Sequence, residues 1–127
     1  MPRILMIEDN EMNRDMLSRR LRRRGFDVVL AVNGAEGIRM AQTESPDLIL
    51  MDLNMPDVDG WEAARLLKQS PDTKHLPIIA LTAHEAPGNR ERLIATGCAE
   101  YHTKPVQLPL LVSQIETILK KLRSDVP

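Results

Sequence analysis

Short apolar runs recur along the chain, and each is followed by a longer stretch with helical periodicity. Five of these runs predict buried strands, because none alternates regularly with polar residues as a half-exposed strand would. The predicted strands are Ile4–Ile7, Val28–Ala31, Leu48–Met51, Ile78–Leu81 and Ala99–Thr103. The fifth is the weakest, since Glu100 and His102 interrupt it.

The stretches between and after these runs predict five helices. In the first helix we expect four apolar residues near one side: Met12, Met16, Leu17 and Leu21. Gly25 and Gly97 follow the first and fourth helices, at the position where a left-handed glycine commonly ends a helix. The predicted helices are Glu11–Arg24, Ala35–Glu44, Trp61–Gln69, Asn89–Thr96 and Leu108–Leu122.

The alternation of strand and helix predicts an α/β fold of five βα units. Helix-length connections imply right-handed crossovers and therefore a parallel sheet covered by helices on both faces. Five strands are too few for a closed eight-stranded barrel, so an open, doubly wound sheet is favoured. The chain has 127 residues, which is the length of one domain. We expect residues 1–123 to form that domain and residues 124–127 a short tail.

Charge and cysteine content narrow the functional class. Seventeen Lys and Arg against eighteen Asp and Glu give a formal net charge of −1, whereas a dedicated nucleic-acid-binding domain normally carries a basic excess. One cysteine excludes an internal disulfide, and the apolar runs are too short for a signal peptide or a membrane span. We expect a cytoplasmic domain that binds neither nucleic acid nor membrane.

Polar side chains gather where the predicted strands end. Glu8 and Asp9 follow the first strand, Asp52 the third, Thr82 the fourth and Lys104 the fifth. In doubly wound sheets, ligands bind beyond the carboxyl ends of the strands. Three carboxylates in close proximity raise one another's pKa or recruit a cation, and rigidly placed oxygen ligands suit Mg²⁺.

Such a rim has the parts needed for phosphoryl chemistry. Asp52 ends a fully apolar strand and is a plausible nucleophile towards a phosphoryl group, with Lys104 as a fixed cation and Thr82 as a hydroxyl donor. The histidines are scattered and do not have the spacing of a zinc site. We expect each of them to have a surface or loop role: His75, His84 and His102.

In chain order, these motifs resemble the receiver domain of two-component response regulators, the CheY-like family with a flavodoxin-like fold. The resemblance covers residues 3–122 and rests on five motifs: Ile7-Glu8-Asp9-Asn10, Met51-Asp52-Leu53-Asn54-Met55-Pro56, Asp59-Gly60, Leu81-Thr82-Ala83 and Lys104-Pro105. The start of the chain is most similar to the receivers of phosphorelays and hybrid kinases and to the stand-alone DivK group, through Glu8, Asp9, Asn10 and Asn13.

The resemblance implies a role for each site residue. Asp52 is then the phosphoacceptor, and Mg²⁺ is bound by Asp9, Asp52 and the backbone carbonyl of Asn54, with Glu8 reaching the metal through water. Thr82 and Tyr101 are then the switch hydroxyl and the switch aromatic residue, and Lys104 is the fixed cation opposite the phosphoryl group. Pro105 follows a cis peptide bond in the family, and the positions of Asn54 and His84 tune dephosphorylation.

The resemblance also implies the biochemical function. The chain would accept a phosphoryl group from a histidine kinase or a histidine phosphotransfer protein, and then bind a partner protein or pass the group on. It would act as a monomer or as a phosphorylation-dependent dimer, and not as an enzyme beyond its own phosphotransfer and autodephosphorylation. Because the chain ends five residues after Leu122, we expect a single-domain regulator unless it is part of a longer protein.

Two other functional classes differ from this one in the residues that they need. A pseudo-receiver that never accepts phosphate is an alternative, but such modules usually lack the acceptor, the acid pair or the lysine. A haloacid-dehalogenase-like phosphatase is rejected because it needs a second acid two residues after the nucleophile, where this chain has Asn54.

A basic run occupies the end of the first predicted helix. Five of its six positions are arginine: Arg19, Arg20, Arg22, Arg23 and Arg24. One interpretation is a solvated helix face, favoured by the negative end of the helix dipole. The other is a docking face for an acidic patch on the helical bundle of a kinase. The sequence leaves both open.

Overall fold

Strands and helices alternate along the whole chain in the computed structural model, which describes residues 1–53, 60–83 and 89–124. The strands are β1 (Arg3–Ile7), β2 (Asp27–Ala31), β3 (Leu48–Asp52), β4 (Ile78–Thr82) and β5 (Glu100–Thr103). The helices are α1 (Glu11–Arg23), α2 (Gly34–Thr43), α3 (Gly60–Gln69), α4 (Asn89–Thr96) and α5 (Leu108–Ser124). Each predicted element is present, with ends that differ by at most two residues from the prediction.

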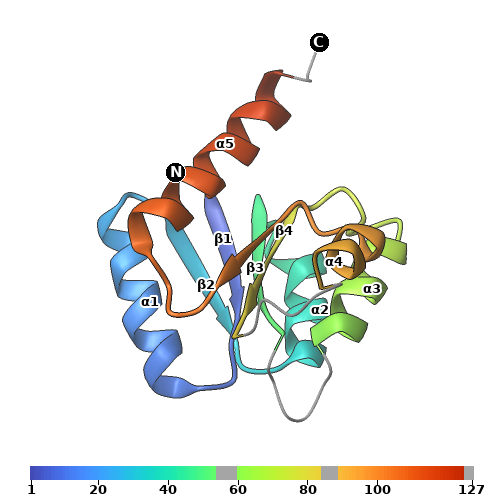
Figure 1. The fold of residues 1–127 in the computed structure, drawn as a ribbon, viewed down its shortest axis with the longest axis horizontal. Helices are drawn as coiled ribbons and strands as arrows, with labels where there is room; N and C mark the ends of the chain where they lie inside the picture. The colour runs from blue at the N-terminus through green and yellow to red at the C-terminus, as the bar shows by residue number, and fades with distance from the viewer. Residues whose placement is uncertain (54–59, 84–88, 125–127) are drawn as a thin grey trace.

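The strands form one parallel sheet in the order β2-β1-β3-β4-β5. Helices α1 and α5 cover one face and α2, α3 and α4 the other (Figure 1). The chain therefore passes from β1 through α1 to β2 on one side of β1, and then through α2 to β3 on the other side of β1. The crevice of a doubly wound sheet opens where the connections diverge, beyond the carboxyl ends of β1 and β3.

Successive residues of each central strand belong to two separate cores. In β3, Leu48 and Leu50 pack in the layer of α1 and α5, whereas Ile49 and Met51 pack in the layer of α2, α3 and α4. Side chains of a strand alternate between the faces of the sheet, and both faces are covered here. This is why the strand sequences show no polar alternation.

Helices α1 and α4 end at the two predicted glycines, Gly25 and Gly97. Gly25 has φ +93°, its N–H donates to the carbonyl of Arg22 at 3.0 Å, and the N–H of Phe26 donates to the carbonyl of Leu21 at 3.3 Å. These two hydrogen bonds form a Schellman motif, which needs a left-handed residue at this position. Gly97, with φ +101°, ends α4 in the same way.

The predicted apolar side of α1 is wrong for two of its four residues. Leu21 is buried and Leu17 is half-buried, but Met12 is 75% exposed and Met16 is 48% exposed. A helix turns once in about 3.6 residues, so Met12 and Leu21, nine positions apart, lie half a turn from each other. The two methionines therefore lie on the outer surface of the helix.

No helix in the described part of the chain is both long enough and apolar enough to cross a membrane.

Candidate functional site

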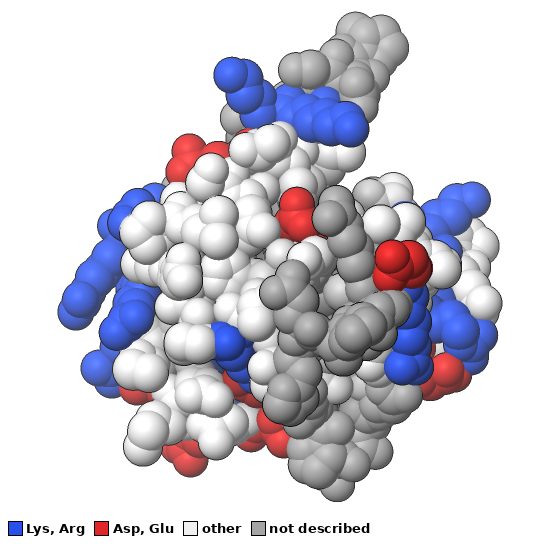
Figure 2. All heavy atoms as spheres, viewed as in Figure 1, with Lys and Arg blue, Asp and Glu red and all other residues white. Residues whose placement is uncertain are grey.

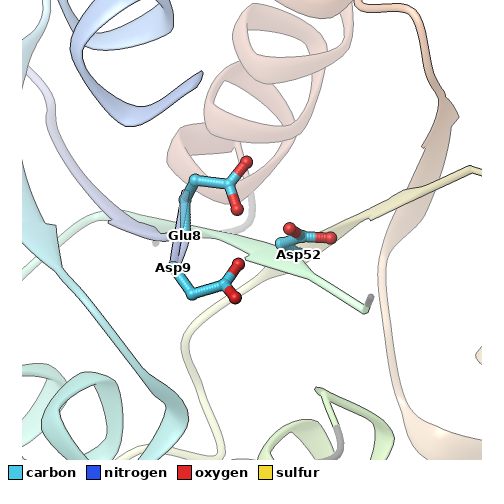
Figure 3. A group of neighbouring side chains, drawn as sticks. All are labelled: Glu8, Asp9 and Asp52. Atoms are coloured by element: carbon cyan, nitrogen blue, oxygen red, sulfur yellow. The ribbon is translucent and has the colours of Figure 1, made fainter. Parts of the chain in front are cut away.

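The register of the central strands brings Glu8 and Asp52 together. Ile7 of β1 pairs with Met51 of β3. The residues that follow them, Glu8 and Asp52, therefore lie side by side at the carboxyl ends of the two strands. Figure 3 shows the carboxylates of Glu8, Asp9 and Asp52 converging from these two strand ends, and one oxygen of each lies within 4.8 Å of the others. Glu8 is 4% exposed and Asp52 2%, while Asp9 is open to solvent.

Lys104 brings a positive charge to the two buried carboxylates. Its Nζ lies 3.0 Å from Oδ1 of Asp52 and 3.9 Å from Oε1 of Glu8. The backbone N–H of Lys104 donates to the carbonyl of Thr82 at 2.7 Å, which continues the pairing of β5 with β4 beyond Thr103. The Lys104–Pro105 peptide bond is cis.

One lysine does not neutralise two buried carboxylates. Burial and the neighbouring Asp52 raise the pKa of Glu8 to about 8, whereas Lys104 and the backbone N–H of Asn10 act in the opposite direction. In the absence of a metal, this shift favours the protonated form of Glu8. A divalent cation among these oxygens would replace that proton and relieve the repulsion. The donor set, made of carboxylate oxygens and free of sulfur, is the kind that Mg²⁺ prefers.

The raised pKa of Glu8 predicts that the metal-free protein loses stability as pH rises. Glu8 titrates near 4.5 in the unfolded chain and near 8 in the folded one, so between these values the folded state binds more protons. The free energy of unfolding then falls with increasing pH in this window, by up to about 1.4 kcal/mol per unit. Urea unfolding in EDTA from pH 5.5 to 8.5 should show a shallower slope for Glu8→Gln; equal slopes for both proteins would contradict the assignment.

The two residues that the family resemblance links to switching lie on one face of the sheet. Thr82 is buried at the end of β4, and by strand alternation it faces the same layer as Ile78 and Ala80, which pack with α2, α3 and α4. Tyr101 of β5 is half-buried and packs against that same layer. The acids and the lysine meet at the rim, next to the end of β4.

The remaining candidate residues are one asparagine and three histidines. Asn54 and His84 lie outside the described residues. His75 is exposed as expected. For His102 the expectation of a surface or loop role is wrong, because it is 2% exposed. Its burial is permitted by two hydrogen bonds, one to Gln114 of α5 and one from the backbone of Gln107, the residue before α5.

The five arginines at the end of α1 are all exposed. Figure 2 shows Lys and Arg side chains along the left edge of the molecule, where α1 lies in Figure 1. Arg19 pairs with Asp15 at 3.2 Å, and Arg22 donates to the carbonyl of Val28 at 2.9 Å. Arg20 lines a pocket of about 270 Å³ between α1 and residues 104–106, which reaches Glu8 and Lys104. This pocket is a direct approach to the carboxylates from the side of α1.

Gly60, the first residue of α3, lies against the backbone at the end of β3. A Cβ at this position would come within 2.6 Å of the carbonyl oxygen of Asp52 and 2.7 Å of Cα of Leu53. Main-chain atoms cannot move aside as a flexible side chain can. The absence of a Cβ therefore lets α3 begin directly beside Asp52.

Gly60→Ala is expected to lower the free energy of unfolding by about 1–3 kcal/mol and to weaken Mg²⁺ binding, because the clash displaces the backbone of Asp52. The matched control is Gly37→Ala, where the three atoms nearest to an added Cβ all belong to the side chain of Ile7 and not to the main chain. Urea unfolding and calorimetric Mg²⁺ titration of both variants should show lost stability in each but weakened metal binding only for Gly60→Ala. Unchanged Mg²⁺ affinity in Gly60→Ala would refute the proposed displacement.

Comparisons with known proteins agree with this geometry. The sequence matches the response regulator receiver domain over residues 4–116. It is 35% identical over 116 residues to the polar-differentiation response regulator DivK of Brucella anthropi, spanning 91% of this chain and 94% of that protein.

Solved structures show the same fold. The chemotaxis protein CheY4 of Vibrio cholerae has a TM-score of 0.86 at 28% identity, with 92% of this chain and 98% of that chain covered. The receiver domain of a sensor histidine kinase from Pseudomonas aeruginosa has a TM-score of 0.78 at 33% identity, with 94% and 95% covered, and its structure is described with a magnesium ion coordinated in the active-site cleft. The chain therefore belongs to the response regulator receiver family, the CheY-like signalling switches of two-component systems.

Proposed function

We propose that this receiver accepts a phosphoryl group on Asp52 from the phosphohistidine of a histidine kinase or of a histidine phosphotransfer protein. The observation that carries the proposal is the environment of Asp52. Its buried carboxylate lies 3.0 Å from the Lys104 ammonium and shares a cluster of oxygens with Glu8 and Asp9. A nucleophile, a fixed cation and a set of metal ligands are the parts that phosphoryl transfer to a carboxylate requires.

The acids are proposed to hold Mg²⁺. Asp9 and Asp52 would bind it directly, Glu8 through water, and the backbone carbonyl of Asn54, outside the described residues, would complete the protein ligands. When bound, Mg²⁺ neutralises negative charge on the carboxylates and on the phosphoryl oxygens. Burial and the neighbouring Asp52 raise the pKa of Glu8. This supports the proposal, because a bound cation would favour the ionised form of both carboxylates.

In the proposed transfer, a carboxylate oxygen of Asp52 attacks phosphorus. The new O–P bond forms as the P–N bond to the donor imidazole breaks, and the electron pair of that bond returns to the imidazole nitrogen. Lys104 offsets charge on a phosphoryl oxygen, and the Thr82 hydroxyl donates to another. Later hydrolysis, in which water attacks phosphorus and inorganic phosphate leaves, regenerates Asp52. Asn54 and His84 are proposed to tune the rate of this step.

The phosphorylated state is proposed to differ in Thr82 and Tyr101. Thr82 would move towards the phosphoryl group, and Tyr101 would turn further into the space beside α4. Their shared layer supports this coupling. The new charge can shift the populations of two conformations only through its different interactions with each. The favoured state then binds a partner protein or passes the phosphoryl group on, as a monomer or as a phosphorylation-dependent dimer.

Intact-mass measurement tests the function directly. The folded protein is incubated with a small acyl phosphate, with Mg²⁺ or with EDTA. We expect a single phosphoryl adduct that requires Mg²⁺ and is released by neutral hydroxylamine, as an acyl phosphate is and a phosphoserine is not. If folded, Mg²⁺-bound protein forms no adduct, the alternative is supported: an interaction module that works without phosphate.

A further inference from the structure

His102 lies buried between β5 and α5, and its ring nitrogens have separate partners. The backbone N–H of Gln107 donates to Nε2 at 3.0 Å, and Nδ1 lies 3.0 Å from Oε1 of Gln114. Because a backbone N–H can only donate, Nε2 must be unprotonated. These partners assign the ring proton to Nδ1, which donates to Gln114. His102 is therefore held as one neutral tautomer with both nitrogens in use.

Gln107 directly precedes α5, at its N-cap position. Its carbonyl accepts the first helical hydrogen bond, from the N–H of Leu111 at 2.9 Å. The N–H of such a capping residue is commonly bound by a Glu or Gln side chain three residues later. Here that position is Leu110, which has no acceptor. The imidazole of His102 takes over this role from the neighbouring strand.

The hydrogen bond from Gln107 fixes one end of the segment that carries Lys104. The other end is fixed by the N–H of Lys104, which donates to the carbonyl of Thr82 at 2.7 Å. Only Pro105 and Val106 lie between these two anchored residues. The position of the Lys104 ammonium, 3.0 Å from Asp52, therefore depends on a segment anchored to β4 at one end and to His102 at the other.

Gln114 completes the arrangement. While its Oε1 accepts from His102, its Nε2 donates to the carbonyl of Tyr101 at 3.1 Å. One amide side chain of α5 thus orients the imidazole and contacts the main chain of Tyr101. An amide with both ends bound cannot rotate without losing a hydrogen bond, so it keeps the ring of His102 in the orientation that Gln107 requires.

We propose that His102 is a positioning residue for phosphoryl transfer: through the N–H of Gln107 it holds the Lys104 segment in place against Asp52, and Gln114 orients its ring. This inference rests on the function proposed above. His102 does not contact the reacting atoms. Its effect is on the placement of Lys104, and small displacements of a catalytic group cause large losses of rate.

Two polar substitutions distinguish a positioning role of His102 from a role in packing alone. In His102→Gln, the amide oxygen reaches the former position of Nε2 and can still accept from Gln107. In His102→Asn, the shorter side chain reaches only the position of Nδ1, so the Gln107 N–H loses its acceptor. We expect His102→Gln to retain most of the rate of labelling by a small acyl phosphate, and His102→Asn to lose on the order of 10-fold. His75→Asn, the same change at an exposed histidine, should label at the wild-type rate.

A double-mutant cycle tests whether the effect passes through Lys104. In a Lys104→Met background, measured over longer incubations, His102→Asn should change the rate less than 2-fold, and Mg²⁺ affinity should be unchanged by His102→Asn alone. If His102→Asn does not fold, Gln114→Met replaces it in the same cycle, with a several-fold loss expected from the unoriented imidazole.

Each outcome separates this inference from the proposed function. If the wild type is labelled, and His102→Asn is labelled equally fast or loses the same factor with and without Lys104, the positioning role is wrong while the proposed function stands. If the wild type itself is not labelled, the proposed function fails and the positioning role fails with it.

Discussion

Replacing Asp52 with asparagine is expected to abolish phosphoryl uptake while leaving the fold intact. The amide has the shape of the carboxylate but no nucleophilic oxygen anion, so the O–P bond cannot form. The protein should not lose stability through charge burial, because the substitution removes one of two carboxylates that lie almost fully buried side by side. After burial, the neighbouring Asp52 carboxylate is the main reason for the raised pKa of Glu8. The substitution removes that carboxylate, so the pKa of Glu8 should fall.

The measurement combines intact mass with urea unfolding at pH 8. Asp52→Asn should show no adduct after incubation with an acyl phosphate and Mg²⁺, together with a cooperative unfolding transition. Asp9→Asn is the matched control, because it keeps the acceptor and changes an exposed acid of the same cluster; it should be labelled only at higher Mg²⁺ concentration. A Mg²⁺-dependent adduct that persists in Asp52→Asn would place the acceptor elsewhere.

Replacing Lys104 with methionine is expected to lower the rate of phosphoryl transfer by about 10²–10³-fold, the usual cost of removing one preorganised charge or donor from a developing anion. Methionine keeps the apolar stem of the lysine and removes the ammonium that lies 3.0 Å from Asp52 and 3.9 Å from Glu8. Mg²⁺ should still bind, since the carboxylates remain.

The same substitution should change the dependence of stability on pH. Lys104 lowers the pKa of Glu8, so its loss lets Glu8 hold its proton to higher pH. The variant should therefore be destabilised relative to the wild type by more at pH 9, where both buried carboxylates must ionise beside each other, than at pH 6. Urea unfolding at both pH values and single-turnover labelling measure the two effects. A Lys104→Met protein that labels as fast as the wild type would exclude the lysine from the transfer.

The acid cluster could be predicted from the sequence because it depends on local rules. Glu8 and Asp52 each follow an apolar run, the side chains of strands alternate with a period of two, and parallel strands end at one edge of the sheet. Once β1 and β3 are neighbours, these rules alone bring the two carboxylates together. The same reasoning placed Lys104 at that edge.

The burial of His102 and the exposure of Met12 on α1 could not be predicted from these local rules. Burial of His102 depends on a backbone N–H five residues later and on Gln114 in the middle of α5, and no local pattern shows that these groups will converge. The error for Met12 has a different origin. The four apolar residues of the helix spread over half a turn, so that Met12 lies opposite Leu21 and not on the same side.

The edge position of β5 affects how much of the time the complete site is formed. This strand has four residues and, among the described residues, pairs only with β4, whereas β1 and β3 have a strand on each side. Amide hydrogen exchange in native proteins occurs largely through partial openings, and edge elements open at lower free energy than the centre of a sheet. An opening that detaches β5 carries away Lys104, Tyr101 and His102 together and leaves Glu8 and Asp52 in the closed part of the sheet. The protection factors of the β5 amides, and not the global free energy of unfolding, therefore measure how much of the time the complete site exists.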